Sequence, residues 1–347
     1  MSEPNALTFF FMKQATYRRH ELIFKRPGGT SRGVLKTKET FFLEVTENGK
    51  TGLGECAVFR GLSYDDAPEY EEKLQWLCDH INEEKEQLET ALKEYPSIWF
   101  GYEQALLNLK HGSDLYFPSA FTTGEAFIKI NGLIWMGNAA FMQEQIQEKL
   151  QLGFDCIKLK IGVNWREERN ILTQLRAQFP EAQLELRVDA NGGFTPTEAI
   201  VVLQQLSDLG IHSIEQPIKA GQAEEMKKLC ATTPTPIALD EELIGIVKNE
   251  DKIALLENIR PQYIILKPSL VGGISGTDEW INAAEDLQIG WWITSALESN
   301  VGLNAIAQYT YTKNPMLPQG LGTGALFTNN TPSPLELTGD ELRMRKS

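Results

Sequence analysis

The stretch Cys156-Ile157-Lys158-Leu159-Lys160 is a short apolar run that ends in a charged side chain, and the sequence repeats this design. Further apolar runs end, at intervals of 25 to 29 residues, at Asp189, Glu215, Asp240, Lys267 and Ser295. Such an interval fits one strand, one helix and two loops. If these units close into a β/α barrel, their polar ends gather at the rim where active sites are built.

The whole chain after Gly124 alternates between strand and helix patterns. The predicted strands are 126–135, 156–160, 184–189, 211–215, 236–240, 263–267, 290–295 and 317–321. The predicted helices are 139–152, 165–178, 196–208, 222–230, 250–257, 275–287 and 300–311. Alternating units of this kind form parallel sheets. Seven βα units and a final strand predict an α/β fold of modified TIM-barrel type, (β/α)7β, over residues 126–324.

The first 125 residues follow a different pattern. Residues 7–24 and 40–58 are predicted antiparallel strands, with Asn48-Gly49 as a hairpin turn. Residues 65–92 and 98–112 have helical periodicity. We therefore expect an α+β capping domain over residues 1–125, completed by the C-terminal segment 325–347, in which residues 335–345 return to the first domain.

Composition excludes several classes of partner. The chain has 347 residues and a net charge of −14, which argues against nucleic acid and anionic membranes as partners. The apolar run at residues 7–12 is too short to span a membrane. Four cysteines without a CxxC pair suit the reducing cytoplasm, where we expect the protein. The sequence leaves the oligomeric state open.

Asp189, Glu215 and Asp240 are candidate metal ligands. An acid at a strand end often only caps the next helix, but three in successive units favour a shared site. Three carboxylates suit Mg²⁺, or Mn²⁺, better than zinc. Strand alternation makes Asp240 the inward-facing residue, with Glu241 and Glu242 flanking the site.

Three lysines are candidate catalytic residues. Lys158 and Lys160 are two apart on one strand and so point to the same face. Near a dication and each other, their pKa values should be lowered, as a lysine base requires near neutral pH. Lys267 ends the strand opposite. It either pairs with Asp240 or faces Lys160 across the space that a substrate would fill.

Four further residues are candidate substrate contacts. Asn191 follows Asp189 in a tight turn, Ser295 and Ser299 begin the seventh loop, and Gly322 lies in a glycine-rich segment after the last strand. The alternative for Gly322 is a plain turn. None of the four histidines falls at a strand end, and the nucleotide-binding patterns GxGxxG and GxxxxGK[ST] are absent from the sequence.

These motifs resemble a known family. Lys158-x-Lys160, Asp189-Ala190-Asn191-Gly192, Glu215-Gln216-Pro217, Asp240-Glu241 and Lys267-Pro268 are similar to the motifs of the muconate-lactonising branch of the enolase superfamily. Within it, residues 294–299 resemble the seventh strand of the o-succinylbenzoate synthase family. Dipeptide epimerases of the branch carry Asp-x-Asp at the eighth strand, where this chain has Gly320-Leu321-Gly322-Thr323.

The resemblance implies a reaction. The substrate would be 2-succinyl-6-hydroxy-2,4-cyclohexadiene-1-carboxylate, dehydrated to 2-succinylbenzoate for menaquinone biosynthesis. Mg²⁺ on the three acids would stabilise an enediolate. Lys160 would remove the α-proton and protonate the departing hydroxide, and Lys267 would stabilise the enediolate from the other face; substrate stereochemistry decides which lysine is the base. The alternatives are an N-acylamino acid racemase, another enzyme of the branch, or a non-catalytic binding barrel.

The basic, glycine-rich segment 25–33 is predicted to be a loop. The enediolate must be shielded from water. We expect this segment, with Arg26, Arg32 and Phe59-Arg60-Gly61, to close over the rim and contact the succinyl end of the substrate. The alternative is a surface turn with solvated arginines.

Overall fold

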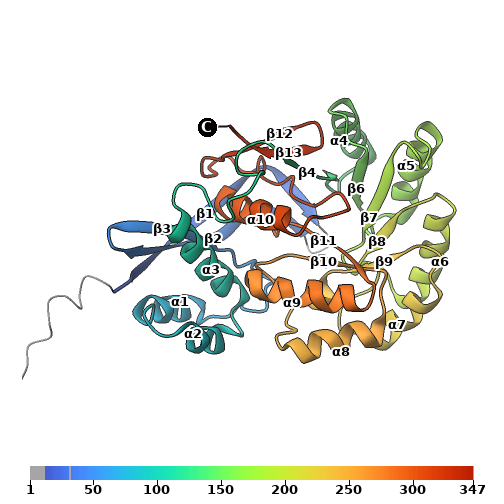
Figure 1. Cartoon of the computed structure of the whole chain (residues 1–347). Coiled ribbons are helices and arrows are strands. Elements are labelled where there is room, and N and C mark those ends of the chain that lie inside the picture. Colours follow the sequence, from blue (N-terminus) through green and yellow to red (C-terminus); the bar gives the residue numbers. More distant parts are fainter. Residues whose placement is uncertain (1–11, 31–32, 347) are drawn as a thin grey trace, which may run out of the picture.

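The computed structural model describes residues 12–30 and 33–346 (Figure 1). Its first element is an antiparallel sheet in the order β1-β2-β3 (Gln14–Thr30, Gly33–Glu47 and Lys50–Cys56). The predicted turn at Asn48-Gly49 is confirmed, and both residues have positive φ, 50° and 74°. A two-residue turn of this kind matches the twist of paired strands. Of the predicted first strand, residues 7–11 lie outside the described residues.

The prediction of a loop at residues 25–33 is wrong as far as Thr30. The β1–β2 hairpin continues through it, with Gly28 paired to Leu35 and Thr30 to Gly33, after a register shift between Ile23 and Gly28. Because this segment is rich in glycine, proline and charged residues, it lacks the alternation of apolar and polar side chains by which a strand is recognised. Its backbone can nevertheless pair across an irregularity without that alternation. We call residues 24–30 and 33–36 the arm.

Three helices follow: α1 (Tyr70–Asp79), α2 (Lys85–Leu92) and α3 (Pro96–His111). The predicted single helix at 65–92 is thus two helices. The α3 helix packs directly on β3, because a Cβ atom on Gly54 would lie 1.9 Å from the carbonyl oxygen of Gly101. Only glycine permits that close approach of helix and strand.

The alternation predicted after Gly124 is confirmed (Figure 1). The parallel sheet has the order β11-β10-β9-β8-β7-β6-β5. Its strands are β5 (Gly132–Ile134), β6 (Cys156–Lys160), β7 (Glu185–Asp189), β8 (Ser213–Glu215), β9 (Ile237–Leu239), β10 (Tyr263–Leu266) and β11 (Gly290–Ile293). Its helices are α4 (Ala139–Gln151), α5 (Trp165–Gln178), α6 (Pro196–Ser207), α7 (Ala223–Thr232), α8 (Asn249–Ile259), α9 (Gly273–Asp286) and α10 (Asn300–Thr312), with a short 3₁₀ turn η2 (Glu241–Leu243).

The predicted last strand closes the ring through single bridges. Gln319 bridges to Ile130 at the start of the first barrel strand, and Gly320 bridges to Thr294 at the end of the seventh. Four backbone hydrogen bonds of 2.8 to 3.1 Å support these bridges. The (β/α)7β barrel is therefore confirmed, although its eighth strand is short.

The C-terminal segment contacts both the first sheet and the start of the barrel. Strands β12 (Leu335–Thr338) and β13 (Glu341–Met344) form a sheet with β4 (Phe127–Lys129), the front half of the predicted first barrel strand. The contact with the first sheet comes earlier, where Phe327 bridges to Phe24. The hairpin at 335–344 therefore extends the sheet that β4 begins. The return of residues 335–345 to the first domain and the domain boundaries 1–125, 126–324 and 325–347 stay predictions.

Two carboxylates of the first region, the buried Glu55 and the half-buried Glu103, cap helices of the barrel. Glu55 on β3 accepts hydrogen bonds from the N–H groups of Ser299 and Gly302 and from the Ser299 hydroxyl, at 2.6 to 2.9 Å, at the N-terminus of α10. Glu103 on α3 accepts the N–H groups of Ile274 (2.6 Å) and Ser275 (3.1 Å) at the N-terminus of α9. Carboxylates there are stabilised by free N–H groups and the helix dipole.

Glu103 should make stability depend on pH. Burial raises its pKa to about 7 from 4.5, although the hydrogen bonds from Ser275 and Ile274 oppose the shift. A carboxyl whose folded pKa is raised contributes stability at low pH and loses it as pH rises towards the folded pKa. The shift corresponds to roughly 3 kcal/mol. Urea unfolding of Glu103→Gln should therefore vary less between pH 5 and 8 than that of the wild type. Exposed Glu89→Gln is the control, and an equal pH slope in both variants would contradict the assignment.

Two findings bear on the expected environment of the chain. Cys56, Cys78, Cys156 and Cys230 are all buried and free. Within residues 12–30 and 33–346, no helix combines the length and the apolar character needed to cross a membrane.

Candidate active site

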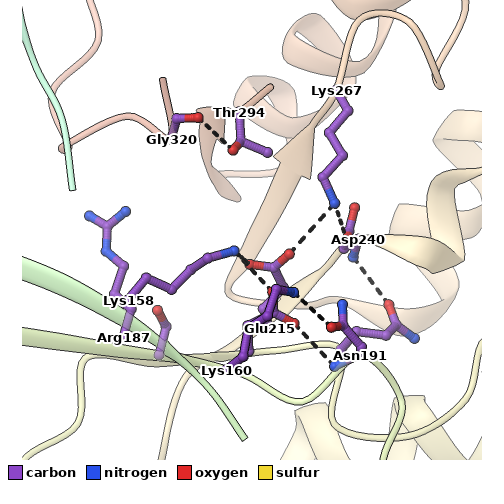
Figure 2. A network of polar contacts seen from close by, with 12 residues as sticks. Lys158, Lys160, Arg187, Asn191, Glu215, Asp240, Lys267, Thr294 and Gly320 are labelled. Atoms are coloured by element: carbon purple, nitrogen blue, oxygen red, sulfur yellow. Dashed lines mark hydrogen bonds and ion pairs between the residues drawn. The ribbon is translucent and has the colours of Figure 1, made fainter. Parts of the chain in front are cut away.

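The strand register places the predicted charged residues side by side at the carboxyl ends of the barrel strands. Lys160 on β6 pairs with Asp189 on β7, which pairs in turn with Glu215 on β8. Asp240 and Lys267 come directly after β9 and β10. Because parallel strands end at one rim, the five side chains meet there. Figure 2 shows Lys160, Glu215, Asp240 and Lys267 among them.

The lysines and carboxylates form one contiguous ion-pair network (Figure 2). The Nζ atom of Lys158 lies 2.5 Å from Glu215 Oε2 and 3.1 Å from Asp189 Oδ2. The Nζ atom of Lys160 lies 2.8 Å from Asp189 Oδ2. Lys267 pairs with Asp240 and lies 3.8 Å from Glu215 Oε1. All three carboxylates are at most 2% exposed, so each pair lies in a poorly screened environment.

These contacts shift the pKa values strongly. Burial lowers the pKa of Lys158, but Asp189 and Glu215 outweigh it and raise that pKa above its ordinary value. The pKa of Lys267 is raised in the same way by Asp240, against desolvation. Burial would raise the pKa of Asp189, but Lys158 and Lys160 hold it well below its usual range. For Lys158, the expected lowering of the pKa is therefore wrong for the protein groups alone, because it counted a dication and neglected the nearby carboxylates.

The donor set fits a hard divalent cation, but the side chains are not gathered around one point. Among the described residues, no group of three or more His, Cys, Asp or Glu is placed so that it could hold a metal ion. The ammonium groups of Lys158 and Lys267 lie between the carboxylates instead. Oxygen Oε1 of Glu215 is buried without a hydrogen-bond partner among the described residues. Three buried carboxylates on neighbouring strands, one with an oxygen that accepts no hydrogen bond, suit Mg²⁺ once the ammonium groups move aside.

Neighbouring side chains hold this network in place. Asn191 has a positive φ of 43° and accepts a hydrogen bond from Lys160 at 2.7 Å, while its own amide donates to Glu241 at 3.1 Å. The side-chain oxygen of Gln216 accepts a hydrogen bond from the backbone N–H group of Asp240 at 3.1 Å, and its side-chain nitrogen donates one to Glu242 at 3.1 Å. Glu241 and Glu242 thus flank the site as expected.

A cavity opens on the network. It encloses about 80 Å³. Its lining includes Lys158, Lys160, Asp189, Asn191, Lys267, Thr294, Ser295, Ala296, Leu297, Gly320, Gly322, Thr323, Asn131, Leu133 and Trp135 from the barrel, and Leu35, Phe59 and Leu62 from the first region. Lys160 and Lys267 therefore share one cavity, as the sequence predicts.

The predicted substrate contacts divide into three groups. Asn191, Ser295 and Gly322 line the cavity. Ser299 does not: it is fully buried, and its hydroxyl donates to Glu55. Arg26 is exposed and is also not among the lining residues, and Arg32 lies outside the described residues.

The arm and its partner segment reach the cavity only in part. Leu35 and Phe59 line it, whereas Arg60 binds Glu39 and Asp66 instead, each at 2.8 Å. The arm packs on the barrel at Gly28, where a Cβ atom would lie 3.0 Å from the ring of Trp135. The first region thus supplies an apolar roof.

Several lining residues were not predicted. Leu35, Leu62, Leu133 and Trp135 carry no signal, because an apolar residue in a strand looks the same whether it faces a core or a cavity. Asn131 does carry one: a polar residue followed by Gly132 interrupts an apolar strand.

Two protein-family models match the chain. The model described as "Enolase C-terminal domain-like" matches residues 141–337, and the model described as "MenC, N-terminal domain" matches residues 12–109. A protein of Desulfotalea psychrophila named o-succinylbenzoate synthase is 47% identical, over 94% of this chain and 97% of the relative. The chain belongs to the o-succinylbenzoate synthase family of the enolase superfamily. It is therefore an enzyme, rather than the non-catalytic barrel considered above.

Solved structures of this family share the fold. The crystal structure of MenC from Desulfotalea psychrophila aligns with a TM-score of 0.86 at 43% identity, covering 96% of this chain and 99% of that one. A structure of o-succinylbenzoate synthase from Thermosynechococcus elongatus BP-1, described as complexed with Mg in the active site, has a TM-score of 0.73 at 24% identity and covers 88% and 92% of the two chains. The predicted family and barrel fold are thus confirmed.

Proposed function

We propose that this enzyme dehydrates 2-succinyl-6-hydroxy-2,4-cyclohexadiene-1-carboxylate to 2-succinylbenzoate in menaquinone biosynthesis. One observation carries the assignment within the family's chemistry: Lys160 and Lys267 line a single cavity beside Asp189. The eighth strand adds Gly320 and Gly322 to this cavity and no acidic side chain among the described lining residues. A cationic substrate, such as a dipeptide, would lack a counter-charge there.

Asp189, Glu215 and Asp240 would hold Mg²⁺, with Mn²⁺ as a substitute. The bound cation would offset negative charge that develops on the substrate carboxylate. With the three carboxylates engaged as ligands, Lys158 would lose the anionic partners that raise its pKa.

Lys160 would carry both proton transfers. As the free amine it takes the proton from the carbon next to the carboxylate, so that this C–H bond breaks. As the ammonium it returns the proton to the hydroxyl leaving the neighbouring carbon, and water departs as the ring becomes aromatic. The hydrogen bond that Lys160 donates to the amide oxygen of Asn191 orients the lysine. Lys267 would stay protonated and stabilise the anion from the other face, and Lys158 would add a second positive charge at the carboxylate.

The direct test is product formation. Purified protein, Mg²⁺ and the cyclohexadiene substrate should give 2-succinylbenzoate, observable by its ultraviolet absorbance. Absence of product with an intact fold would contradict the proposal.

An N-acylamino acid racemase is the second candidate. It also needs two lysines on opposite faces of one carbon, which Lys160 and Lys267 can provide. α-Proton exchange on N-succinylamino acids would report this activity.

We expect the arm to act as a lid. The cavity of about 80 Å³ is smaller than the roughly 300 Å³ or more of a typical ligand pocket, so the arm must move for substrate to enter. Shortening residues 27–31 should raise KM and lower kcat, while Mg²⁺ affinity stays unchanged. Two glycines inserted at the Asn48-Gly49 turn, in the same sheet, serve as the control. A wild-type kcat/KM in the shortened variant would place specificity wholly in the barrel.

The remaining assignments follow from the same chemistry. The substrate would be a small carboxylate, and neither nucleic acid nor a membrane is expected as a partner. Buried free cysteines and the soluble substrate agree with a cytoplasmic location.

A further inference from the structure

The charged and uncharged walls of the cavity lie on different strands. Its charged lining residues come from the second, third and sixth barrel strands: Lys158 and Lys160, Asp189, and Lys267. The seventh, eighth and first strands supply Thr294, Gly320, Gly322, Thr323, Asn131, Leu133 and Trp135. In an eight-strand ring, the eighth strand stands opposite the fourth, which carries Glu215. The described part of this opposite wall has no charged side chain.

Two buried polar atoms on the uncharged wall lack partners. Oδ1 of Asn131 and Oγ1 of Thr323 have no hydrogen-bond partner among the described residues. Both side chains line the cavity and are only 3% and 5% exposed. Their chain segments adjoin, since Gln319 bridges to Ile130 and a Cβ atom on Gly322 would lie 3.7 Å from the backbone carbonyl oxygen of Asn131.

Such atoms are rare because they are costly. A buried polar group normally finds a partner, and leaving one without costs on the order of 1–3 kcal/mol. Binding sites tolerate this cost when the ligand supplies the missing partner. A threonine hydroxyl donates, and an asparagine amide can donate after a half-turn of its terminal group.

We infer that Asn131 and Thr323 form an uncharged subsite that donates hydrogen bonds to the ketone oxygen of the substrate's succinyl arm. This rests on the proposed function. With the ring carboxylate at the charged wall, the ketone on the neighbouring ring carbon lies to the side of that carboxylate. The first strand, which carries Asn131, adjoins the lysine-bearing second strand on one side of the charged wall. The ketone is the acceptor of choice, because a carboxylate buried there would have no cation beside it in the described lining. The terminal carboxylate then continues towards the arm, whose exposed Arg26 lies in solvent.

A comparison of two ligands that differ only at the ketone isolates the effect of its hydrogen bonds on affinity. One is 2-succinylbenzoate, and the other is 2-(3-carboxypropyl)benzoate, in which a methylene replaces the ketone. Thr323→Val and Asn131→Leu remove the donors and nearly keep the volume. In calorimetry with Mg²⁺, each variant should bind 2-succinylbenzoate about fivefold to tenfold more weakly than wild type, as expected for one lost neutral hydrogen bond. Each should bind the methylene analogue within about twofold of wild type.

Thr310→Val is the matched control. The Thr310 hydroxyl on α10 is also buried without a partner among the described residues, but it is not among the cavity-lining residues. Its removal should leave both affinities unchanged.

Wild-type affinity of Thr323→Val for 2-succinylbenzoate, or equal weakening for both ligands, would overturn the subsite. The proposed function fails separately, if wild-type protein gives no product from the cyclohexadiene substrate. Kinetics should agree: Thr323→Val should raise KM more than it lowers kcat, because the ketone contact exists before and during the reaction.

Discussion

Replacing Lys160 with alanine should lower kcat for dehydration by about four orders of magnitude, since general acid–base catalysis alone contributes up to roughly 10⁴. The loss is expected to reach this limit because one amine takes the proton and then returns it to the leaving hydroxyl. Lys160 contacts Asp189 and Asn191 but no residue of the first region through a hydrogen bond in the described chain, so the fold should persist.

The matched control is Lys129→Ala. Lys129 ends β4 and pairs with Asp155 and Asp340 at the barrel exterior, so its loss should leave kcat within about twofold of wild type. Unfolding curves of both variants verify the fold. A Lys160→Ala rate within tenfold of wild type would mean that another group is the base.

Asp240→Asn should weaken Mg²⁺ binding and activity by orders of magnitude. The substitution removes an anionic ligand and leaves the buried ammonium of Lys267 without its closest partner. Titration calorimetry with Mg²⁺ and steady-state assays measure the two effects. The exposed Asp208→Asn, which changes charge equally at the end of α6, is the control. Full activity of the wild type in excess chelator would contradict metal dependence.

The candidate site could be predicted from the sequence because its chemistry follows a fixed interval. Lys160, Asp189 and Glu215 stand at strand ends, and parallel pairing brings strand ends to one rim whatever the loops do. Lys158 and Lys160 are two residues apart on one strand, and this spacing predicts that both side chains point to the same face.

The predictions that failed depend on tertiary contacts that leave no local pattern. Ser299 has the sequence position expected of a substrate contact, but its hydroxyl donates a hydrogen bond to Glu55, 244 residues away in the chain. The arm has the composition of a loop, yet cross-strand pairing and the Trp135 ring keep it extended. The raised pKa of Lys158 depends on its distances of 3.1 Å to Asp189 and 2.5 Å to Glu215, which no sequence interval specifies.

The shape of the cavity could not be predicted from the sequence, because it too depends on tertiary contacts. Asn131 and Thr323 are 192 positions apart and line one cavity because the eighth strand bridges back to the first. Their significance lies in missing hydrogen bonds, and these can be recognised only once every neighbour is placed.

The most direct test of the account is a comparison of two reactions on one preparation of the wild-type enzyme with Mg²⁺. The measured quantities are kcat/KM for dehydration of the cyclohexadiene substrate and kcat/KM for racemisation of an N-succinylamino acid. The uncharged wall and the single-amine elimination predict that dehydration is faster by at least about 100-fold, equivalent to roughly 2.7 kcal/mol of transition-state binding. Racemisation that equals or exceeds dehydration would contradict the account.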